Sequence, residues 1–433
     1  MASSPPVDDR AALDETVKAA PSRLRMIVVL GALVALGPLT IDMYLPALPG
    51  IADELGVSSS IVQLTLTGTL AGLALGQLIV GPLSDSLGRR RPLMAGIVLH
   101  MLASLLCMFA PNIMLLGLAR SLQGVGAAAA TVVAIAVVGD LFAGNAAATV
   151  MSRLMLVLGV APVLAPSLGA AVLLHASWHW VFAALVIVAG GLLLMAVLVL
   201  PETLPAAHRR PLQVRGIAVT YVSLVRDLRF LVLVVVAALG MSGLFAYVSG
   251  AAFVLQDRYG LDQQTFALVF GAGAVALIGT TQFNVVLLRR FSPQRIMVWA
   301  LVAASLAGVV FVGLTVAEVG GLAGFLVSVW LILAAMGLVL PNAPAVALSR
   351  HNEAAGTAAA LLGAAQFGLG AAVAPLVGVL GNDEFALALV MTVGTVVALV
   401  ALLAARVPQG REDDEFAGEA IDEVSPAAVV EPA

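Results

Sequence analysis

Three ionisable residues fall within long apolar stretches of the sequence, where a charge is costly and therefore indicates function. The first is Asp42, within residues 37–46. A carboxyl group in a low-dielectric cavity can exchange a proton near neutral pH or attract a cationic solute. Pro38 and Pro46 flank it, and both are expected to loosen the helix around it. The alternative is a structural carboxylate, paired with an arginine or capping a helix end.

The other two residues are Arg120 and His100. Arg120 is expected about 10 Å below the outer end of its span. Asp42, near the outer third of the first span, is expected at a similar depth, so contact between the two side chains is possible. Arginine keeps its charge at any accessible pH, so its expected role is to tune a carboxylate, with Gln123 extending the same polar face. A purely structural hydrogen-bonding role is the alternative. His100 can titrate but has no acid beside it in the sequence, which favours a structural role.

Membrane-spanning helices must position these groups, and each needs about 20 apolar residues. Twelve such stretches can be drawn, at residues 26–48, 61–82, 92–110, 113–138, 149–174, 179–200, 230–255, 265–288, 294–315, 319–340, 357–380 and 384–405. Six spans on each side of one polar linker are typical of transporters built from repeats. The expected segments are an N-terminal segment (1–25), a six-helix half (26–200), a linker (201–229), a second six-helix half (230–405) and a tail (406–433).

The composition agrees with a polytopic membrane protein. Of 433 residues, 61% are hydrophobic and 11% charged, against about 25% charged in soluble domains. This excludes a soluble enzyme, a nucleic-acid-binding protein and a disordered chain. The single cysteine, Cys107, excludes an intrachain disulfide and a cysteine-based metal site, and we expect no metal or cofactor. The single lysine, Lys18, is not in a P-loop, which excludes an ATP-driven pump of that type.

The charges are unevenly distributed. Residues 406–433 carry two basic and eight acidic groups, and we expect a disordered tail that aids solubility, a recruiting role being the alternative. In the twelve-span arrangement, 19 of the 21 arginines and lysines lie on the side of both termini, while Arg258 lies opposite and Arg120 within a span. The positive-inside rule therefore predicts a multi-pass protein of the cytoplasmic membrane with both termini in the cytoplasm.

A polar loop follows the second span. It contains Gly81, Asp85, Gly88, Arg89 and Arg90, an acid followed by an arginine cluster. The glycines are expected to permit close packing and a sharp turn, and the acid to contact arginines or a helix N-terminus. The run resembles the loop signature of the major facilitator superfamily, although a plain positive-inside loop is the alternative.

Three more stretches resemble drug–proton antiporters of the Bcr/CflA type within that superfamily. One covers residues 42–49, and another covers residues 120–126 with Arg120, Gln123 and Gly124. The third resembles the antiporter motif of span five and contains Gly159, Pro162, Pro166 and Gly169. Ala161 and Ala170 stand where the motif more commonly has glycine, and the second-half copy of the loop signature, near residues 284–295, lacks the acid. The resemblance covers residues 26–405.

The resemblance implies an all-α fold of two pseudo-symmetric six-helix halves that moves drugs outward by alternating access, with the proton as coupling ion. It implies that Asp42 couples transport to the proton or senses the substrate, with Arg120 as its modulator. Asp85 and Arg89 are then expected to form a cytoplasmic gate, and Pro162 and Gly169 a hinge. Candidate cavity residues are Tyr44, Gln63, Phe245, Tyr247, Asn342 and Gln366. Gln63 and Gln77 belong to a small and polar stripe on span two, either a cavity wall or a close helix contact.

We expect a monomer that binds a small molecule and the lipid bilayer but no nucleic acid. A proton-coupled importer or exporter of one metabolite is the alternative function. A receptor is disfavoured because the loops are short, and an enzyme because the sequence shows no catalytic cluster.

Overall fold

The computed structural model describes residues 23–209, 213–349 and 355–404. Most of the predicted N-terminal segment 1–25, and all of the tail 406–433, lie outside them. Within these ranges, twelve helices are long and apolar enough to cross a membrane, which confirms the predicted all-α polytopic fold. No strand occurs in the described ranges.

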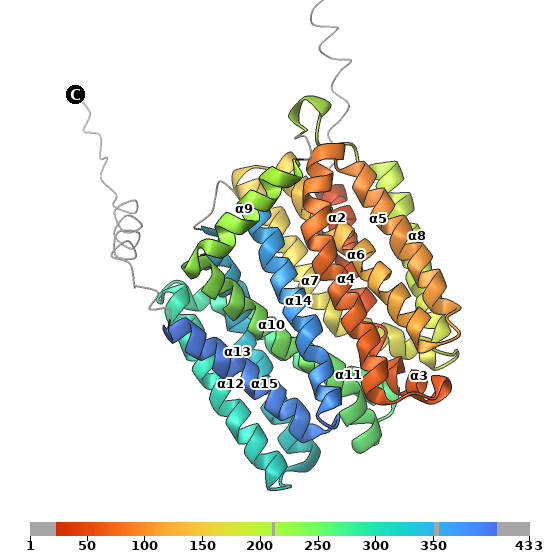
Figure 1. The fold of residues 1–433 in the computed structure, drawn as a ribbon, viewed down its shortest axis with the longest axis vertical. Helices are drawn as coiled ribbons and strands as arrows, with labels where there is room; N and C mark the ends of the chain where they lie inside the picture. Colours follow the sequence, from red (N-terminus) through yellow and green to blue (C-terminus); the bar gives the residue numbers. More distant parts are fainter. Residues whose placement is uncertain (1–22, 210–212, 350–354, 405–433) are drawn as a thin grey trace, which may run out of the picture.

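Two sets of helices flank a linker (Figure 1). The first set contains α2 (Arg23–Asp42), η1 (Leu45–Ala47), α3 (Leu48–Leu55), α4 (Ser59–Leu87), α5 (Arg90–Met108), α6 (Ile113–Leu141), α7 (Gly144–Leu173) and α8 (His179–Val199). The linker contains η2 (Ala206–His208) and α9 (Val214–Arg226). The second set contains α10 (Leu228–Phe253), η3 (Val254–Arg258), α11 (Gln263–Leu287), α12 (Pro293–Val316), α13 (Gly321–Ser349), α14 (Ala355–Val379) and α15 (Glu384–Ala404).

The first span is longer than predicted and is interrupted. It covers Leu24–Leu55 instead of residues 26–48, and its α-helix stops at Asp42 before a short 3₁₀ turn. Pro46 causes the interruption, because it lacks the N–H that would bond the carbonyl of Asp42 in a continuous helix. Asp42 therefore lies near the middle of this span, 18 residues from Leu24 and 13 from Leu55, and not in its outer third.

Small residues bring the helices of the first half close together. A Cβ atom on Gly124 of α6 would lie less than 3.0 Å from the carbonyl oxygen of Thr69 in α4, and one on Gly72 would meet the carbonyl oxygen of Ser121. Backbones at this separation leave no room for a side chain, which is how small residues permit close packing of membrane helices. Added volume at the α4–α6 contact is therefore expected to be destabilising.

The two halves meet along α4 beside α14 and α7 beside α11 (Figure 1). At the end of the bundle opposite the linker, here called the far end, hydrogen bonds join the halves. The Gln63 Nε2 amide donates to Asn382 Oδ1 (2.6 Å), the Ser60 hydroxyl to the Gly378 carbonyl (2.8 Å), and the Gln264 amide to the Ala170 carbonyl (2.7 Å). The far end is therefore closed by neutral hydrogen bonds.

Candidate functional site

A cavity of about 350 Å³ lies between the two halves. Helices α2, α4, α6 and α7 supply its wall on one side, and α10, α11, α13 and α14 on the other. Most of the lining is apolar or aromatic, and its aromatic residues are Phe245, Tyr247, Phe270 and Phe367. Tyr247 stacks on Phe270 with ring centroids 5.0 Å apart. The cavity can therefore hold a partly apolar, ring-containing molecule.

Asp42 is the only charged side chain among the described residues that line this cavity. It is 5% exposed, and no described cation lies within 4.0 Å of its carboxyl group. Asp42 is the last residue of α2, and Pro38 and Ile41 of the same helix line the cavity beside it. An acid with no ion pair to a described residue, in an apolar cavity, can bind a proton or a cationic group.

Arg120 lies on the other side of α2. It is fully buried, and its Nη1 donates to the Thr40 carbonyl (2.9 Å) and to Gln123 Oε1 (2.6 Å), while its guanidinium carbon lies 4.4 Å from the centre of the Tyr44 ring. The Thr40 carbonyl and the Tyr44 ring contact Arg120, whereas Asp42, two residues from each of them, lines the cavity. The contact between Asp42 and Arg120 that the sequence allowed is therefore absent from the described structure.

His100 completes a buried ring of hydrogen bonds around Arg120. Gln123 Nε2 donates to Ser104 Oγ (2.7 Å), which donates to the His100 carbonyl (2.7 Å), and His100 Nε2 lies 2.8 Å from Thr40 Oγ1. The Thr40 hydroxyl already donates to the Leu36 carbonyl (2.6 Å), so the imidazole must donate to Thr40. The ring joins α2, α5 and α6, which gives His100 the structural role expected of it.

The expected cavity residues divide into two groups. Phe245 and Tyr247 line the cavity. The expectation for the other four has to be corrected, because other contacts hold most of them elsewhere. The Tyr44 hydroxyl is hydrogen-bonded to the Thr65 hydroxyl (2.8 Å), and the Gln63 amide is hydrogen-bonded to Asn382 at the far end. Asn342 is hydrogen-bonded to Asn284 (2.8 Å). Gln366 does not line the cavity, whereas its neighbour Phe367 does.

The predicted antiporter motif lies on α7, between the cavity and α2. Gly159 and Pro162 line the cavity, and a Cβ atom on Gly159 would lie 3.5 Å from Ile278 of α11. Pro166 is buried. A Cβ atom on Gly169 would meet the carbonyl oxygen of Met43, at the interruption that follows Asp42. The motif thus touches both the second half and the backbone next to the cavity acid.

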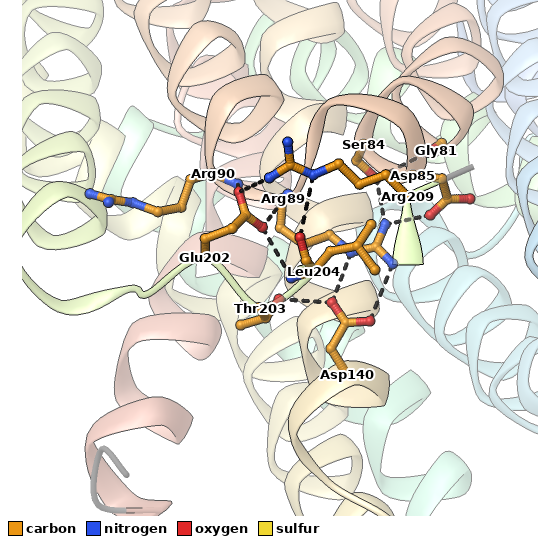
Figure 2. A network of polar contacts seen from close by, with 10 residues as sticks. All are labelled: Gly81, Ser84, Asp85, Arg89, Arg90, Asp140, Glu202, Thr203, Leu204 and Arg209. Carbon is orange, nitrogen blue, oxygen red and sulfur yellow. Dashed lines mark hydrogen bonds and ion pairs between the residues drawn. The ribbon is translucent and has the colours of Figure 1, made fainter. Parts of the chain in front are cut away.

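A network of charged groups lies at the linker end of the first half (Figure 2). Arg89 forms two hydrogen bonds with Asp140, through Nε (2.8 Å) and Nη2 (3.2 Å), and its Nη1 pairs with Asp85. Its backbone N–H donates to Glu202 Oε1 (2.8 Å), which lies just after α8. Burial lowers the pKa of Arg89, but the bonds with Asp140 and Asp85 outweigh it and the net shift is upward.

This network ties together the ends of α4, α5, α6 and α8 (Figure 2). Among the described residues, all partners of Asp85, Arg89 and Arg90 lie between residues 81 and 209. The expected gate between the halves is therefore a clamp within the first half in this conformation. Gly88 provides the sharp turn, with φ of +89°, whereas Gly81 has open space around it instead of the expected close contact.

Two members of the network, Asp140 and Glu202, were not predicted as site residues. Asp140 lies in the last turn of α6, and Glu202 lies just after the C-terminal end of α8. The helix dipole disfavours a negative charge at both positions. An acid at such a position needs a cation, and the arginine cluster before α5 is the nearest source in the sequence. This combination was the signal that could have identified both.

Comparison with known proteins agrees with the predicted family and fold. A profile of the Major Facilitator Superfamily matches residues 30–375. The chain is 39% identical over 385 residues to the uncharacterized MFS-type transporter YdgK of Bacillus subtilis, covering 88% of this chain and 94% of the relative. It is 31% identical over 378 residues to the bicyclomycin resistance protein homolog of Haemophilus influenzae, covering 87% and 94%. It is also 31% identical over 344 residues to a chloramphenicol resistance protein of Pseudomonas aeruginosa, covering 77% and 79%.

A solved structure has the same fold. The xylose transporter XylE from E. coli, in a partially occluded inward open conformation, superposes with a TM-score of 0.70 over 89% of this chain and 98% of that chain, at 14% sequence identity.

Proposed function

The chain belongs to the Major Facilitator Superfamily, and from that premise we propose that it exports drugs and other partly hydrophobic small molecules in exchange for protons. The observation that carries this proposal is the cavity between the halves. Its lining is apolar and aromatic, and its only charged side chain among the described residues is the unpaired Asp42. Such a surface suits ring-containing solutes, because few polar groups need to be matched.

The names of two relatives support the substrate class, since one is a bicyclomycin resistance protein homolog and another a chloramphenicol resistance protein. A sugar or amino acid would need several hydrogen-bonding partners. Besides Asp42, the cavity offers the polar side chains of Gln77, Thr131 and Tyr247. This sparse set favours a drug over a polar metabolite.

Asp42 is the group that exchanges the proton in this mechanism. With the cavity open to the cytoplasm, a solute binds and the proton of Asp42 leaves to the cytoplasm. After the halves rock and the far-end hydrogen bonds open, the solute leaves and a proton from outside returns to the carboxylate. Moving one charge across 100 mV supplies about 2.3 kcal/mol, and 1.4 kcal/mol is a tenfold ratio, so one proton sustains about a 40-fold gradient.

The linker end faces the cytoplasm in this proposal, with both termini, because 19 of the 21 basic residues belong to that side of the twelve-span arrangement. The transporter acts as a monomer, because both walls of the cavity come from one chain.

Everted membrane vesicles test the function. Their lumen is acidified by respiration, and uptake of ethidium, a lipophilic cation, and of chloramphenicol, a neutral drug, is measured with and without this chain. We expect accumulation of at least one probe that a protonophore abolishes. Accumulation that survives the protonophore would contradict proton exchange, and solute accumulation by intact cells instead of vesicles would identify an importer.

A further inference from the structure

The linker helix α9 has one face packed on the transporter and one face that contacts no other described helix. Leu224 is buried, and the Tyr221 hydroxyl donates to the Leu78 carbonyl of α4 (3.4 Å). The helix also packs against α10 and α14 at the linker end (Figure 1). It is 13 residues long and is not one of the membrane spans, so its outward face meets either water or the membrane surface.

The outward face of α9 carries exposed valines and arginines. Val219, Val222 and Val225 are 62%, 50% and 46% exposed. At about 100° per residue, Val222 and Val225 lie within about 60° of each other, next to the packed face. On the same count, Arg215 and Arg226 lie between Val222 and Val219, and the polar Ser223 lies beyond Val219. The exposed valines and the arginines therefore share one face of α9, between the packed face and a polar face.

The arginines of this face have no counter-charge among the described residues. The guanidinium groups of Arg215, Arg226 and Arg229, the last in the first turn of α10, are exposed and form no ion pair with a described residue. Asp227 lies between two of them, and its carboxylate accepts hydrogen bonds from the backbone N–H groups of Arg229 and Phe230. Three arginines without an ion pair to a described residue lie beside exposed valines, so this face suits an anionic partner that also offers an apolar surface.

We propose that α9 is a binding site for anionic phospholipids of the leaflet at the linker end. Exposed apolar side chains beside arginines are the arrangement of helices that lie in the membrane interface, with the apolar groups against acyl chains. The arginine stems extend toward the headgroups, and the planar guanidinium group pairs with phosphate oxygens. The net positive charge favours an anionic headgroup over a zwitterionic one.

A lipid held by α9 is connected to both halves of the transporter. Tyr221 bonds to α4 of the first half, and α9 packs on α10 and α14 of the second. The acidic tail, residues 406–433, has the charge to compete for the same arginines, but the exposed valines require an apolar partner as well, which the acyl chains supply.

The test uses a fluorophore attached to Val222→Cys in a Cys107→Ala background, which removes the chain's single native cysteine. The full chain is placed in nanodiscs of phosphatidylcholine with phosphatidylglycerol, and quenching by brominated forms of each lipid is compared. Each arginine near an anionic surface contributes about a fivefold preference. We therefore expect Arg215→Gln/Arg226→Gln to reduce the preference for phosphatidylglycerol about 25-fold. The matched control Arg289→Gln/Arg290→Gln, two exposed arginines at the same end without an ion pair to a described residue, should retain it.

Three results would overturn the proposal. The first is a fluorophore that neither brominated lipid quenches, and the second is an equal loss of preference in both arginine variants. The third is quenching that appears only when the eight acids of residues 406–433 are changed to Asn and Gln in the full chain, which would make the tail the occupant. The measurement reports lipid contact and does not depend on which solute the chain moves.

Discussion

Replacement of Asp140 by Asn should destabilise the first half far more than the same change at Asp85. The Asp140 side chain is 15% exposed and accepts two hydrogen bonds from Arg89 and one from the Thr203 hydroxyl (2.7 Å). The Asp85 side chain is 48% exposed and accepts one bond from the same arginine. Asn keeps the shape of each side chain but removes the charge and turns one oxygen into an N–H donor facing the guanidinium group.

The two costs differ because the two sites differ in burial. Removing one partner of a buried, hydrogen-bonded ion pair costs about 3–5 kcal/mol, and the slight exposure of Asp140 places Asp140→Asn near the lower end, at about 3 kcal/mol. Exposed ion pairs contribute about 0–1 kcal/mol, which sets the expected cost of Asp85→Asn.

The free energies of unfolding can be measured by denaturation with sodium dodecyl sulfate in mixed micelles, for the parent and both variants. A double-mutant cycle with Arg89→Gln should give a coupling of at least about 2 kcal/mol for Asp140 and less than about 1 kcal/mol for Asp85. Equal costs for the two aspartates, or additive effects of Asp140→Asn and Arg89→Gln, would refute the assignment of Asp140 as the main anchor of Arg89.

Gly124→Ala should cost about 2 kcal/mol because its Cβ would press on a backbone carbonyl, while Gly117→Ala on the same helix, with nothing within 4 Å, should be neutral or slightly stabilising in the same unfolding assay. Gln63→Ala removes two hydrogen bonds across the far end, worth about 1 kcal/mol each, so spin-label distances between the halves there should lengthen, and an unchanged distribution would contradict this. Bonds from Thr265 hold the pKa of Asp262 below its ordinary value, so its capping of α11 is fully present above about pH 4 and is lost as pH falls through the lowered value. Amide exchange at the start of α11 should therefore accelerate in acid, and Asp262→Asn should remove that pH dependence.

The twelve spans could be predicted from the sequence because hydropathy is a sum over neighbouring residues. The depth of Asp42 could not be predicted, because the chain continues after the interruption at Pro46 and the first span ends at Leu55 instead of near residue 48. The partner of Arg120 could not be predicted either. Residue counts do not give the rotation of α2, which places Thr40 beside Arg120 and Asp42 in the cavity, because that rotation depends on packing between helices.

The same reasoning explains the network around Arg89. Its loop could be recognised from the spacing of Asp85 and the arginines, but its strongest partner, Asp140, comes from a helix 51 residues further along the chain. The second half uses neutral groups instead, with Asn284 paired to Asn342. Pairings between distant segments of this kind need the tertiary structure.

The central claim, that Asp42 exchanges the proton that drives export, is tested most directly by counting protons. In proteoliposomes, proton release on addition of a transported drug is measured for the parent, for Asp42→Asn and for Asp53→Asn, which neutralises an acid that does not line the cavity. We expect drug-dependent proton movement and uphill transport to be lost in Asp42→Asn alone, while drug–drug exchange down a gradient persists in all three. Uphill, proton-coupled transport by a correctly folded Asp42→Asn variant would contradict the claim.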